Sequence, residues 1–366
     1  MRVVAIGDVM LDFRVPRITS FFLVPSYMTL GLGRPPLEPY VYSPEAVEYL
    51  RAAGTRNDEL LAQSHAPKSI SIRRRGSPFA GLRPYLAGDV VFANMESALT
   101  RRGRPGGIDM NYRAAPKFAS VLRAAGFNVL SLANNHCLDY GEVALFDTIA
   151  ALRGAGIRPV GAGRNERDAR RGIVITRKAG KVGILAYNNA GPTTTYAGED
   201  WSGCSPGNRF VLDEDIPRMR SRADMVIVSI HWGQEGIFDP NRLERDLAHR
   251  AIDLGADCVL GHHNHIPGPA ELYRGKPIIY SLGNGVFGHD HVHWTGGTLW
   301  ELDFSPRGKF LQGTMRPLTK GTSAAMPRVA QRAEAPGIVA RIAAASKQLG
   351  AEMELHDEGA VLRGAR

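Results

Sequence analysis

The sequence has few cysteines and no long apolar stretch, and each absence excludes a class of protein. Only 3 cysteines occur in 366 residues, and an odd, widely spaced set does not suggest a disulfide framework. No run approaches the roughly 18 apolar residues that a membrane span needs. The first segment, residues 1–8, is too short in apolar residues for a signal peptide. The sequence therefore predicts a cytoplasmic protein with no membrane partner.

Negative charge is in deficit, and the formal net charge is +9. Clustered lysine and arginine neutralise phosphates in proteins that bind nucleic acids. The two arginine clusters, at residues 73–75 and 101–104, have few aromatic residues among them. The pattern therefore disfavours a nucleic acid as partner, and an acidic partner or a bias in composition explains the arginines as well.

Short apolar runs alternate with amphipathic segments, which is the pattern of a layered α/β domain. The expected strands cover residues 3–6, 90–93, 129–132, 172–176, 182–186, 225–230, 258–260 and 278–281. The expected helices cover residues 116–125, 142–151 and 242–254. Turn residues at 178–181 and 274–276 predict hairpins, so the sheets are expected to be mixed.

The chain is expected to form one elaborated domain over residues 1–320 and a helical extension over residues 321–366. Within the extension, residues 336–349 predict an alanine-rich surface helix, and the tail after Gly350 is expected to be poorly ordered. Residues 14–80 interrupt the α/β rhythm with proline-rich pieces and are interpreted as an insertion. Such insertions often act as lids or recognise substrates, and a plain surface excursion is an equal alternative.

Polar residues gather where the expected strands end, which is where open α/β sheets place their sites. Asp8 follows the first strand, and Asp12 comes four residues later. Further along the chain come Asn94, Glu96, Asn134, Asn135, His136, Asp139, His231, Trp232, His262, His263, His265, Asn284, His289, His291, His293 and Trp294. A lone residue of this kind is commonly a helix cap or a core residue, so only the combination carries weight.

The histidines of these clusters predict a metal site. Eight of the 11 histidines fall into them, and scattered structural histidines would not gather in this way. Imidazole is a common nitrogen ligand of divalent metals. Carboxylate, amide and imidazole groups differ from the cysteines of a structural zinc site. They suit one or two ions of calcium, manganese, iron, magnesium or catalytic zinc, and the sequence leaves the identity open.

Six segments in order resemble the motifs of the CapA family, which is named for poly-γ-glutamate capsule biosynthesis. They are residues 7–11, 94–97, 133–141, 229–233, 261–265 and 280–284, and the match spans roughly residues 1 to 305. The family is similar in fold to calcineurin-like metallophosphoesterases. The resemblance therefore implies an α/β protein, a four-layer αββα sandwich of two mixed β-sheets with metals at one sheet edge.

The resemblance also implies roles for individual residues. The implied metal ligands are Asp8, Glu96, Asn135, His231, His263 and His265. Glu96 would bridge two ions, His265 would serve the second ion, and His136 would be the acid or base beside them. His262 is expected to be structural, because the pair His263-x-His265 already fills two ligand roles.

The chain departs from the motifs of the wider fold at several positions. Met10 stands where phosphoesterases carry a histidine, and a thioether cannot replace imidazole for a hard ion. Asn264 stands where proline is usual, and Gly285 where an aromatic residue is usual. Asp12 adds a carboxylate, and residues 289–293 add three imidazoles. The site is thus expected to have one weakened metal position and a surplus of acid and base groups.

A surplus of acids and bases suits proton abstraction at carbon, with a metal stabilising the enolate-like charge. The main expectation is therefore a metal-dependent isomerase that epimerises a residue of a peptide precursor, as in a lasso-peptide branch of the family. The expected catalytic residues are Asp8, Asp12, His136, Asp139, His265, His291 and His293. The expected substrate contacts are Asn94, Asn134, Trp232, Asn284 and Trp294, although packing explains the two tryptophans at least as well.

Two other hypotheses stay open. The first is a hydrolase or transferase, acting as a CapA-type phosphoesterase or on glutamyl polymers. The second is a non-catalytic accessory of polyglutamate assembly, against which the retained ligand set counts. The expected partner of the main hypothesis is a precursor peptide, and the sequence does not fix the oligomeric state.

Overall fold

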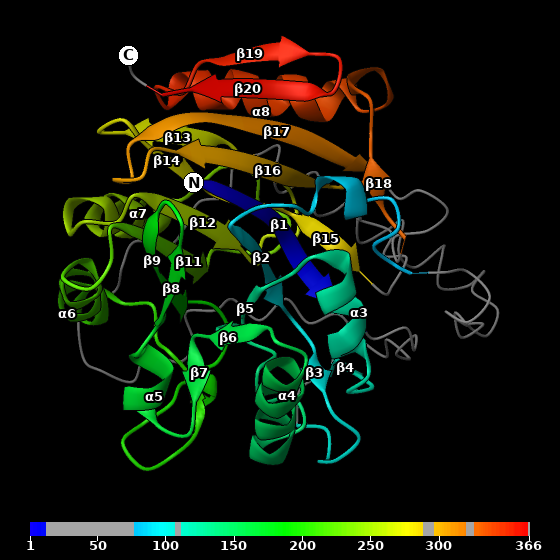
Figure 1. Ribbon diagram of the computed structural model, residues 1–366, viewed down its shortest axis with the longest axis vertical. Coiled ribbons are helices and arrows are strands. Elements are labelled where there is room, and N and C mark those ends of the chain that lie inside the picture. Colours follow the sequence, from blue (N-terminus) through cyan, green and yellow to red (C-terminus); the bar gives the residue numbers. More distant parts are fainter. Residues whose placement is uncertain (12–76, 107–110, 288–295, 320–325, 365–366) are drawn as a thin grey trace, which may run out of the picture.

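The first of two large sheets runs through the middle of the protein. A computed structural model describes residues 1–11, 77–106, 111–287, 296–319 and 326–364, shown in Figure 1. The sheet has ten strands in the order β19-β20-β17-β16-β1-β2-β5-β6, with β15 beside β1 and β18 beside β17. Its strands are β1 (Arg2–Met10), β2 (Val90–Met95), β5 (Val129–Ser131), β6 (Arg158–Val160), β15 (Asn284–Phe287), β16 (Gly297–Phe304), β17 (Phe310–Thr319), β18 (Arg328–Val329), β19 (Met353–His356) and β20 (Gly359–Arg363).

The second sheet has six strands in the order β13-β14-β12-β11-β9-β8. They are β8 (Ile173–Arg177), β9 (Gly180–Asn188), β11 (Met225–His231), β12 (Cys258–His262), β13 (Ala270–Tyr273) and β14 (Lys276–Ile279). Two small sheets pair β3 (Ala98–Leu99) with β4 (Arg113–Ala114), and β7 (Ala162–Gly163) with β10 (Gly203–Cys204). Both predicted hairpins are present, as β8–β9 and β13–β14.

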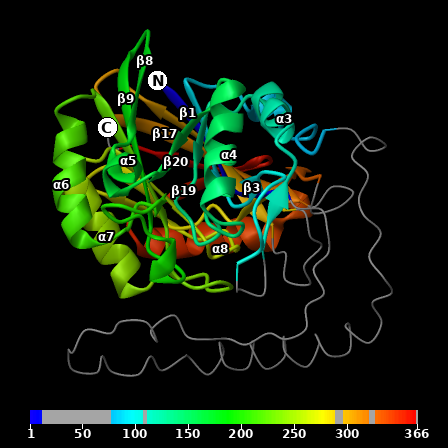
Figure 2. The ribbon, with the colours of Figure 1, turned by 90° about the horizontal axis from the view of Figure 1, so that it is seen from below.

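The helices lie outside the sheets, except at the C-terminal end. They are α3 (Phe118–Ala125), α4 (Glu142–Gly154), α5 (Glu166–Arg170), α6 (Arg209–Arg220), α7 (Arg242–Asp253) and α8 (Pro336–Gln348). Short 3-10 turns are η1 (Arg83–Tyr85), η2 (Thr193–Thr195) and η3 (Arg332–Glu334). Figure 2 shows α6 and α7 on one flank and α3 and α4 on the other.

Three apolar cores fix the order of the layers. Successive side chains of a strand point to opposite faces, so Val3 of β1 joins the core between the sheets, whereas Val4 joins the core beneath α3 and α4. A third core lies between the second sheet and the helices α6 and α7, where Val228 packs near Leu247. Helix, sheet, sheet and helix therefore follow one another, and the predicted four-layer αββα fold is confirmed.

The C-terminal segment belongs to this fold, which corrects two predictions. Residues 353–363 form the hairpin β19–β20, and β20 pairs with β17 of the first sheet. Val339 and Ile342 of α8 are buried in the core between the sheets. The segment is thus neither a separate helical extension nor a poorly ordered tail. Its strands are short and half exposed, so the sequence shows only a weak apolar pattern there. The pairing with β17 is what places the hairpin in the first sheet.

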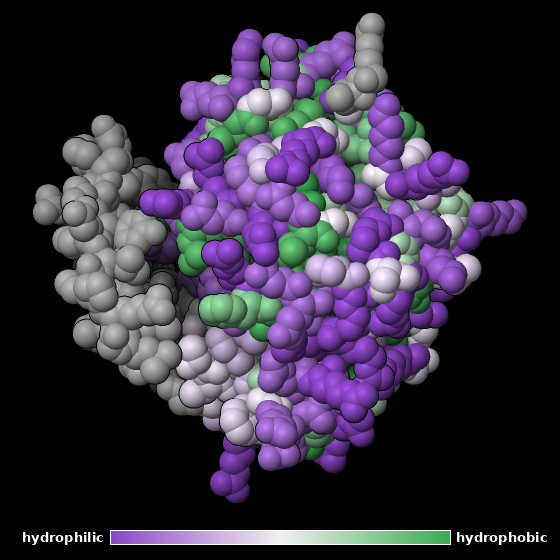
Figure 3. Space-filling model, turned by 90° about the vertical axis from the view of Figure 1, so that its left-hand side faces the viewer, coloured by the Kyte–Doolittle hydropathy of each residue, from purple (hydrophilic) through white to green (hydrophobic). Residues whose placement is uncertain are grey.

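The face that α6 and α7 present is mostly hydrophilic, as Figure 3 shows. Among the described helices, none combines the length and the apolar character that crossing a bilayer requires. Of the predicted insertion, only residues 77–80 fall within the described ranges.

Candidate metal centre

The parallel strands of both sheets bring their polar ends to one place. In the first sheet, Asp8 of β1 lies opposite Asn94 of β2 and Asn284 of β15. In the second sheet, His231 of β11 lies opposite His262 of β12. All five side chains are buried. Residues that are far apart in the chain therefore form one cluster, because the carboxyl ends of parallel strands share an edge.

Two overlapping groups of side chains could each hold a cation. One consists of Glu96, His231 and His263, and the other of Asp8, Glu96 and His265; in each group the ligand atoms lie within 4.8 Å of one another. Glu96 Oε1 lies 3.4 Å from His231 Nε2 and 4.0 Å from His265 Nε2. Glu96 is thus the member that the two groups share, in the place that the sequence motifs assign to a bridge.

Glu96 provides the test of whether a metal fits. Its side chain is fully buried, and neither carboxyl oxygen has a hydrogen-bond partner within the described part of the chain. Burial, followed by the negative charge of Asp8, raises the pKa of Glu96 well above its usual value. Because an unpaired buried carboxylate is costly, a divalent cation between the ligand groups is the partner that this side chain lacks.

Asp8 is held ionised by its neighbours. Asn94 Nδ2 donates to Oδ1 over 2.9 Å, and the main-chain N–H of His263 donates to Oδ2 over 3.2 Å. His262 Nδ1 lies 3.3 Å from Oδ1, and His265 Nδ1 lies 3.5 Å from Oδ2. Burial by itself would raise the pKa of Asp8, but these contacts outweigh it and lower the pKa. His262 supports Asp8, in keeping with its expected structural role.

The two histidines beside Glu96 are neutral and can donate a lone pair. Burial lowers the pKa of His231 well below its usual value and the pKa of His263 to about 4. Neutral imidazole is the form that binds a metal. Asn135 Oδ1 lies 2.8 Å from His231 Nε2, so the structure also places this predicted ligand within the cluster.

The loop after β12 carries backbone strain that the sequence did not reveal. His263 has a φ of 91° and His265 a φ of 57°, although both are L residues with bulky side chains. Such conformations cost about 1 to 3 kcal/mol each and gather at functional sites. The main-chain carbonyl of Asn264 accepts from Gly236 N–H over 2.9 Å, and Asn264 Nδ2 donates to the Ile237 carbonyl over 3.1 Å. These bonds anchor Asn264 between the two strained histidines.

His136 and Asp139 form a pair beside the metal ligands. His136 Nδ1 lies 2.9 Å from Asp139 Oδ2, and both side chains are buried. With the carboxylate on Nδ1, the other ring nitrogen is left for proton transfer. The structure thus brings together His136 and Asp139, two of the residues expected to be catalytic.

The buried residues of the predicted substrate set are hydrogen-bonded within the protein. Asn134 donates to Asn94 Oδ1 over 3.0 Å, and Asn284 Oδ1 lies 2.9 Å from His265 Nδ1. Trp232 is fully buried and donates to the Tyr280 carbonyl over 2.9 Å. These contacts explain the four residues without a substrate, and the substrate contacts expected for Asn94, Asn134, Asn284 and Trp232 stay a prediction. The three asparagines support metal-site residues, and the tryptophan packs in the outer core.

Several expected site residues cannot be placed. Asp12, His291, His293 and Trp294 lie outside the described residues, so their catalytic and substrate-binding roles remain predictions. Met10 is described and fully buried, in a small apolar cluster with Tyr112 and Phe287. It supplies packing where the wider fold has an imidazole, and neither candidate ligand group includes it.

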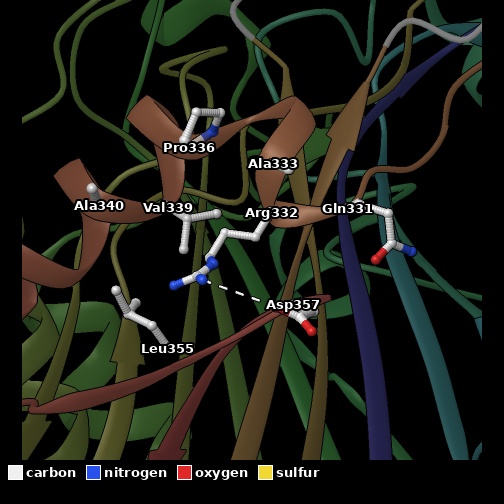
Figure 4. Close-up of a pocket in the computed structure, with 8 residues that line it drawn as sticks. All are labelled: Gln331, Arg332, Ala333, Pro336, Val339, Ala340, Leu355 and Asp357. Carbon is white, nitrogen blue, oxygen red and sulfur yellow. Dashed lines mark ion pairs between the residues drawn. The ribbon is translucent and has the colours of Figure 1, made fainter.

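The described pocket at the C-terminal end lies away from these groups. It has a volume of about 460 Å³ and lies between α8 and β19, with Arg332 directed into it beside Val339 and Asp357, as Figure 4 shows. None of the predicted site residues lines it. The side chains of the candidate metal centre are therefore separate from those that line this pocket.

The buried carboxyl group of Glu244 leads to a prediction about how the stability of the protein depends on pH. It closes the capping box of α7 through Asn241, and burial raises its pKa from 4.5 to about 7. The folded state thus favours the protonated carboxyl, so stability present below pH 4.5 is lost as the pH rises through 7. Glu244→Gln keeps the cap and removes this loss. At pH 8 we expect it to exceed the wild type by up to about 3 kcal/mol.

Urea unfolding of both proteins at several pH values measures this difference. At pH 4 the two free energies of unfolding should be close, and the gap should open between pH 4.5 and 7. A gap that does not change with pH would show that Glu244 does not titrate in this range. All other carboxylates are the same in the two proteins, so their contributions cancel in the difference between the free energies of unfolding.

Comparison with known proteins finds relatives over most of the chain. Residues 2–289 match the family model described as bacterial capsule synthesis protein PGA_cap. A probable polyglutamine synthesis accessory protein of Mycobacterium tuberculosis is 33% identical over 306 residues, covering 78% of this chain and 75% of the relative. The PGA biosynthesis protein CapA of Bacillus subtilis is 33% identical over 233 residues, covering 63% and 61%.

Solved structures give a more distant likeness. A calcineurin-like phosphoesterase, YfkN from Bacillus subtilis, is 14% identical with a TM-score of 0.39, covering 90% of this chain and 88% of that chain. A hypothetical protein from Thermus thermophilus is 18% identical with a TM-score of 0.44, covering 87% and 98%. At these identities the likeness concerns the fold alone, because one fold hosts many activities.

Proposed function

Because the chain belongs to the bacterial capsule synthesis protein family PGA_cap, we propose that it is a divalent-metal-dependent hydrolase of glutamyl-polymer synthesis. The bond it would cleave is the amide between glutamyl units of a polymer or its precursor. The relatives whose names refer to polyglutamine or PGA synthesis support the substrate class. The hydrolytic reaction rests on the chemistry of the site.

One observation carries the hydrolytic proposal, namely the buried and unpartnered carboxylate of Glu96 between two groups of ligands. A protein that merely kept the fold would gain stability by replacing this carboxylate with an apolar or neutral residue. The strained backbone at His263 and His265 adds a second cost. Retained costs of this kind favour a working metal centre over a non-catalytic accessory.

The residues of the chain divide the work of amide hydrolysis. Glu96, His231 and His263 would hold the first cation, and Asp8, Glu96 and His265 a second, weaker one. When bound, a divalent cation supplies a Lewis acid that polarises the scissile group and acidifies water. Asp139 orients His136 through Nδ1, so His136 Nε2 is the atom that would take a proton from the attacking water and return it to the leaving nitrogen.

The names of the relatives favour this hydrolase over the epimerase hypothesis. The additional acids and bases of the epimerase hypothesis, Asp12, His291 and His293, lie outside the described residues, so they count neither for it nor against it. The names of the relatives refer to polyglutamine, PGA or capsule synthesis and not to epimerisation. Within the described residues, the His136–Asp139 pair lies outside both ligand groups, and hydrolysis needs one such pair.

The test is to incubate the purified chain with poly-γ-glutamate of defined length, after chelation and after reloading with Mn²⁺. We expect new amino termini to appear only in the reloaded sample, because the reaction needs the cation. A phosphodiester substrate, bis(4-nitrophenyl) phosphate, is assayed in parallel. Equal release of amino termini before and after verified metal removal would contradict the proposal.

Three further outcomes would overturn it in distinct ways. Release of nitrophenol without new amino termini would make the chain a phosphoesterase. Deuterium uptake from solvent at a peptide α-carbon, again without new amino termini, would restore the epimerase hypothesis. No reaction of any kind by a protein shown to bind Mn²⁺ would favour a non-catalytic accessory.

A further inference from the structure

Described residues on either side of positions 107–110, between β3 and β4, contact the turn that carries His136 and Asp139. Gly106 N–H donates to the main-chain carbonyl of Asp139 over 2.7 Å. Tyr140 Oη donates to the Asn111 carbonyl over 3.4 Å, and the Arg113 guanidinium lies 4.5 Å from the centre of the Tyr140 ring. Figure 1 shows β3 and β4 beside α4, which follows this turn. The described part of the segment is thus anchored on the turn at several points.

One residue of this segment touches both members of the pair. The main-chain N–H of Tyr112 donates to Asp139 Oδ2 over 2.6 Å, and His136 Nδ1 lies 2.9 Å from the same oxygen. The Tyr112 ring packs against the His136 imidazole, with 4.5 Å between ring centres and 45° between the ring planes. Tyr112, His136 and Asp139 are all at least nine-tenths buried, so these contacts are shielded from water.

The carboxylate of Asp139 depends on this arrangement. Its other oxygen, Oδ1, is buried and has no hydrogen-bond partner in the described part of the chain. Oδ2 therefore carries the hydrogen bonding that fixes the plane of the carboxylate. Without the hydrogen bond from Tyr112, the imidazole of His136 would be the one group among the described residues bonded to Oδ2. The carboxylate could then turn together with the imidazole and would not fix its orientation.

The ring of Tyr112 also fills the space between the two sides of the site. Its centre lies 6.3 Å from the centre of Phe287, and the Phe287 ring lies 5.0 Å from that of His265. With Met10, the two aromatic rings form a buried apolar cluster. His136 and His265 are thus packed against opposite ends of one cluster. A smaller residue at position 112 would leave a gap beside the imidazole.

We propose that Tyr112 is the positioning residue of the His136–Asp139 pair, holding the carboxylate by its main-chain N–H and the imidazole by its ring. The catalytic consequence rests on the proposed function, whereas the positioning itself does not. A fixed carboxylate on Nδ1 keeps the proton there and leaves Nε2 free, which is the tautomer that proton transfer needs. Neither the metal ligands nor the family motifs include this residue.

The experiment reads the tautomer of His136 directly, in the full chain labelled with ¹⁵N at histidine. Two-bond correlations distinguish a ring protonated at Nδ1 from one protonated at Nε2, and the His136→Gln spectrum identifies the signals. We expect one Nδ1–H tautomer in the wild type and in Tyr112→Phe, which keeps ring and N–H. Tyr112→Ala should show a mixture, because the ring that confines the imidazole is gone.

Turnover provides the second measurement. If the proposed hydrolysis occurs, Tyr112→Ala should lower kcat roughly 10- to 100-fold with little change in KM, since misplacing a catalytic group has effects of this size. Tyr112→Phe should restore the wild-type rate. Retention of Mn²⁺-induced stabilisation in Tyr112→Ala shows that the variant is folded.

The two proposals can fail separately. A single Nδ1–H tautomer in folded Tyr112→Ala would overturn the positioning role, whatever the activity. Loss of the fixed tautomer in a protein that shows no hydrolysis would sustain the positioning role and count against the proposed function. The spectroscopic measurement needs no substrate, so neither result depends on the other.

Discussion

Replacing Glu96 with glutamine is expected to abolish the stabilisation of the folded chain by Mn²⁺. Glu96 is the side chain that both ligand groups share, so its loss affects both cation positions at once. Substitutions that only support a ligand commonly weaken metal binding 10- to 100-fold, and removal of a shared charged ligand should cost roughly 100-fold or more. A metal at 100 times its dissociation constant stabilises a protein by about 2.7 kcal/mol, and this increment should disappear.

The same substitution should not destabilise the chain when no metal is present. In the wild type the carboxylate is fully buried, and no hydrogen-bond donor is found for it within the described residues. Glutamine has the same shape without the charge, so the metal-free variant should unfold at or above the wild-type temperature. A residue that served only the architecture would show the opposite pattern, with lower stability in both states.

Thermal unfolding with and without Mn²⁺, together with calorimetric titration of the ion, measures both effects. Glu244→Gln is the matched control, because Glu244 is a buried carboxylate outside the ligand groups. It should keep the full metal-induced increment. A Glu96→Gln protein that still binds Mn²⁺ with wild-type affinity would show that the cluster is not the metal centre.

Replacing His136 with glutamine should lower the rate of hydrolysis by roughly 100- to 10,000-fold, the usual contribution of a general acid or base. Metal binding should change little, because His136 belongs to neither ligand group. Proton transfer from a ring oriented by Asp139 is lost, whereas Glu96, His231 and His263 remain in place. The defect should lie in kcat rather than in KM, since the imidazole acts on the leaving group.

His249 offers a matched control for this experiment. Its Nε2 lies 2.8 Å from Glu271 Oε1, so it forms a histidine–carboxylate pair like that of His136 but away from the ligand groups. His249→Gln should leave the rate of hydrolysis unchanged while removing a comparable contact. If both substitutions lower the rate equally, the effect of His136→Gln would be one of stability and not of proton transfer.

The strand-end motifs predicted much of the site because they are local. Asp8, His231 and His263 each follow an apolar run that is long enough to indicate a buried strand. Parallel strands with a common edge then bring such residues together, whatever the details of packing. For the same reason the four-layer fold and both hairpins could be expected from residue patterns and from the family resemblance.

Contacts across the fold were harder to anticipate. Trp232 directly follows the candidate ligand His231, yet its side chain lies in the core beneath α7, because neighbouring side chains along an extended chain face opposite ways. The hairpin at residues 353–363 has a weak apolar pattern and becomes part of the first sheet only through its pairing with β17. Neither result depends on residues that lie close in the sequence.

The sequence by itself indicated a divalent-cation site, because carboxylate, amide and imidazole side chains gather at the ends of its strands. Only the tertiary structure decided which of these groups lie close enough to share a cation and which orient a neighbouring side chain. It shows Glu96 shared and without a hydrogen-bond donor in the described chain, His263 and His265 on a strained backbone, and Asp139 fixed by Tyr112 from a separate segment. The physical reason is that burial and the contacts between segments set the charge and the orientation of each group, and neither is encoded at a single position.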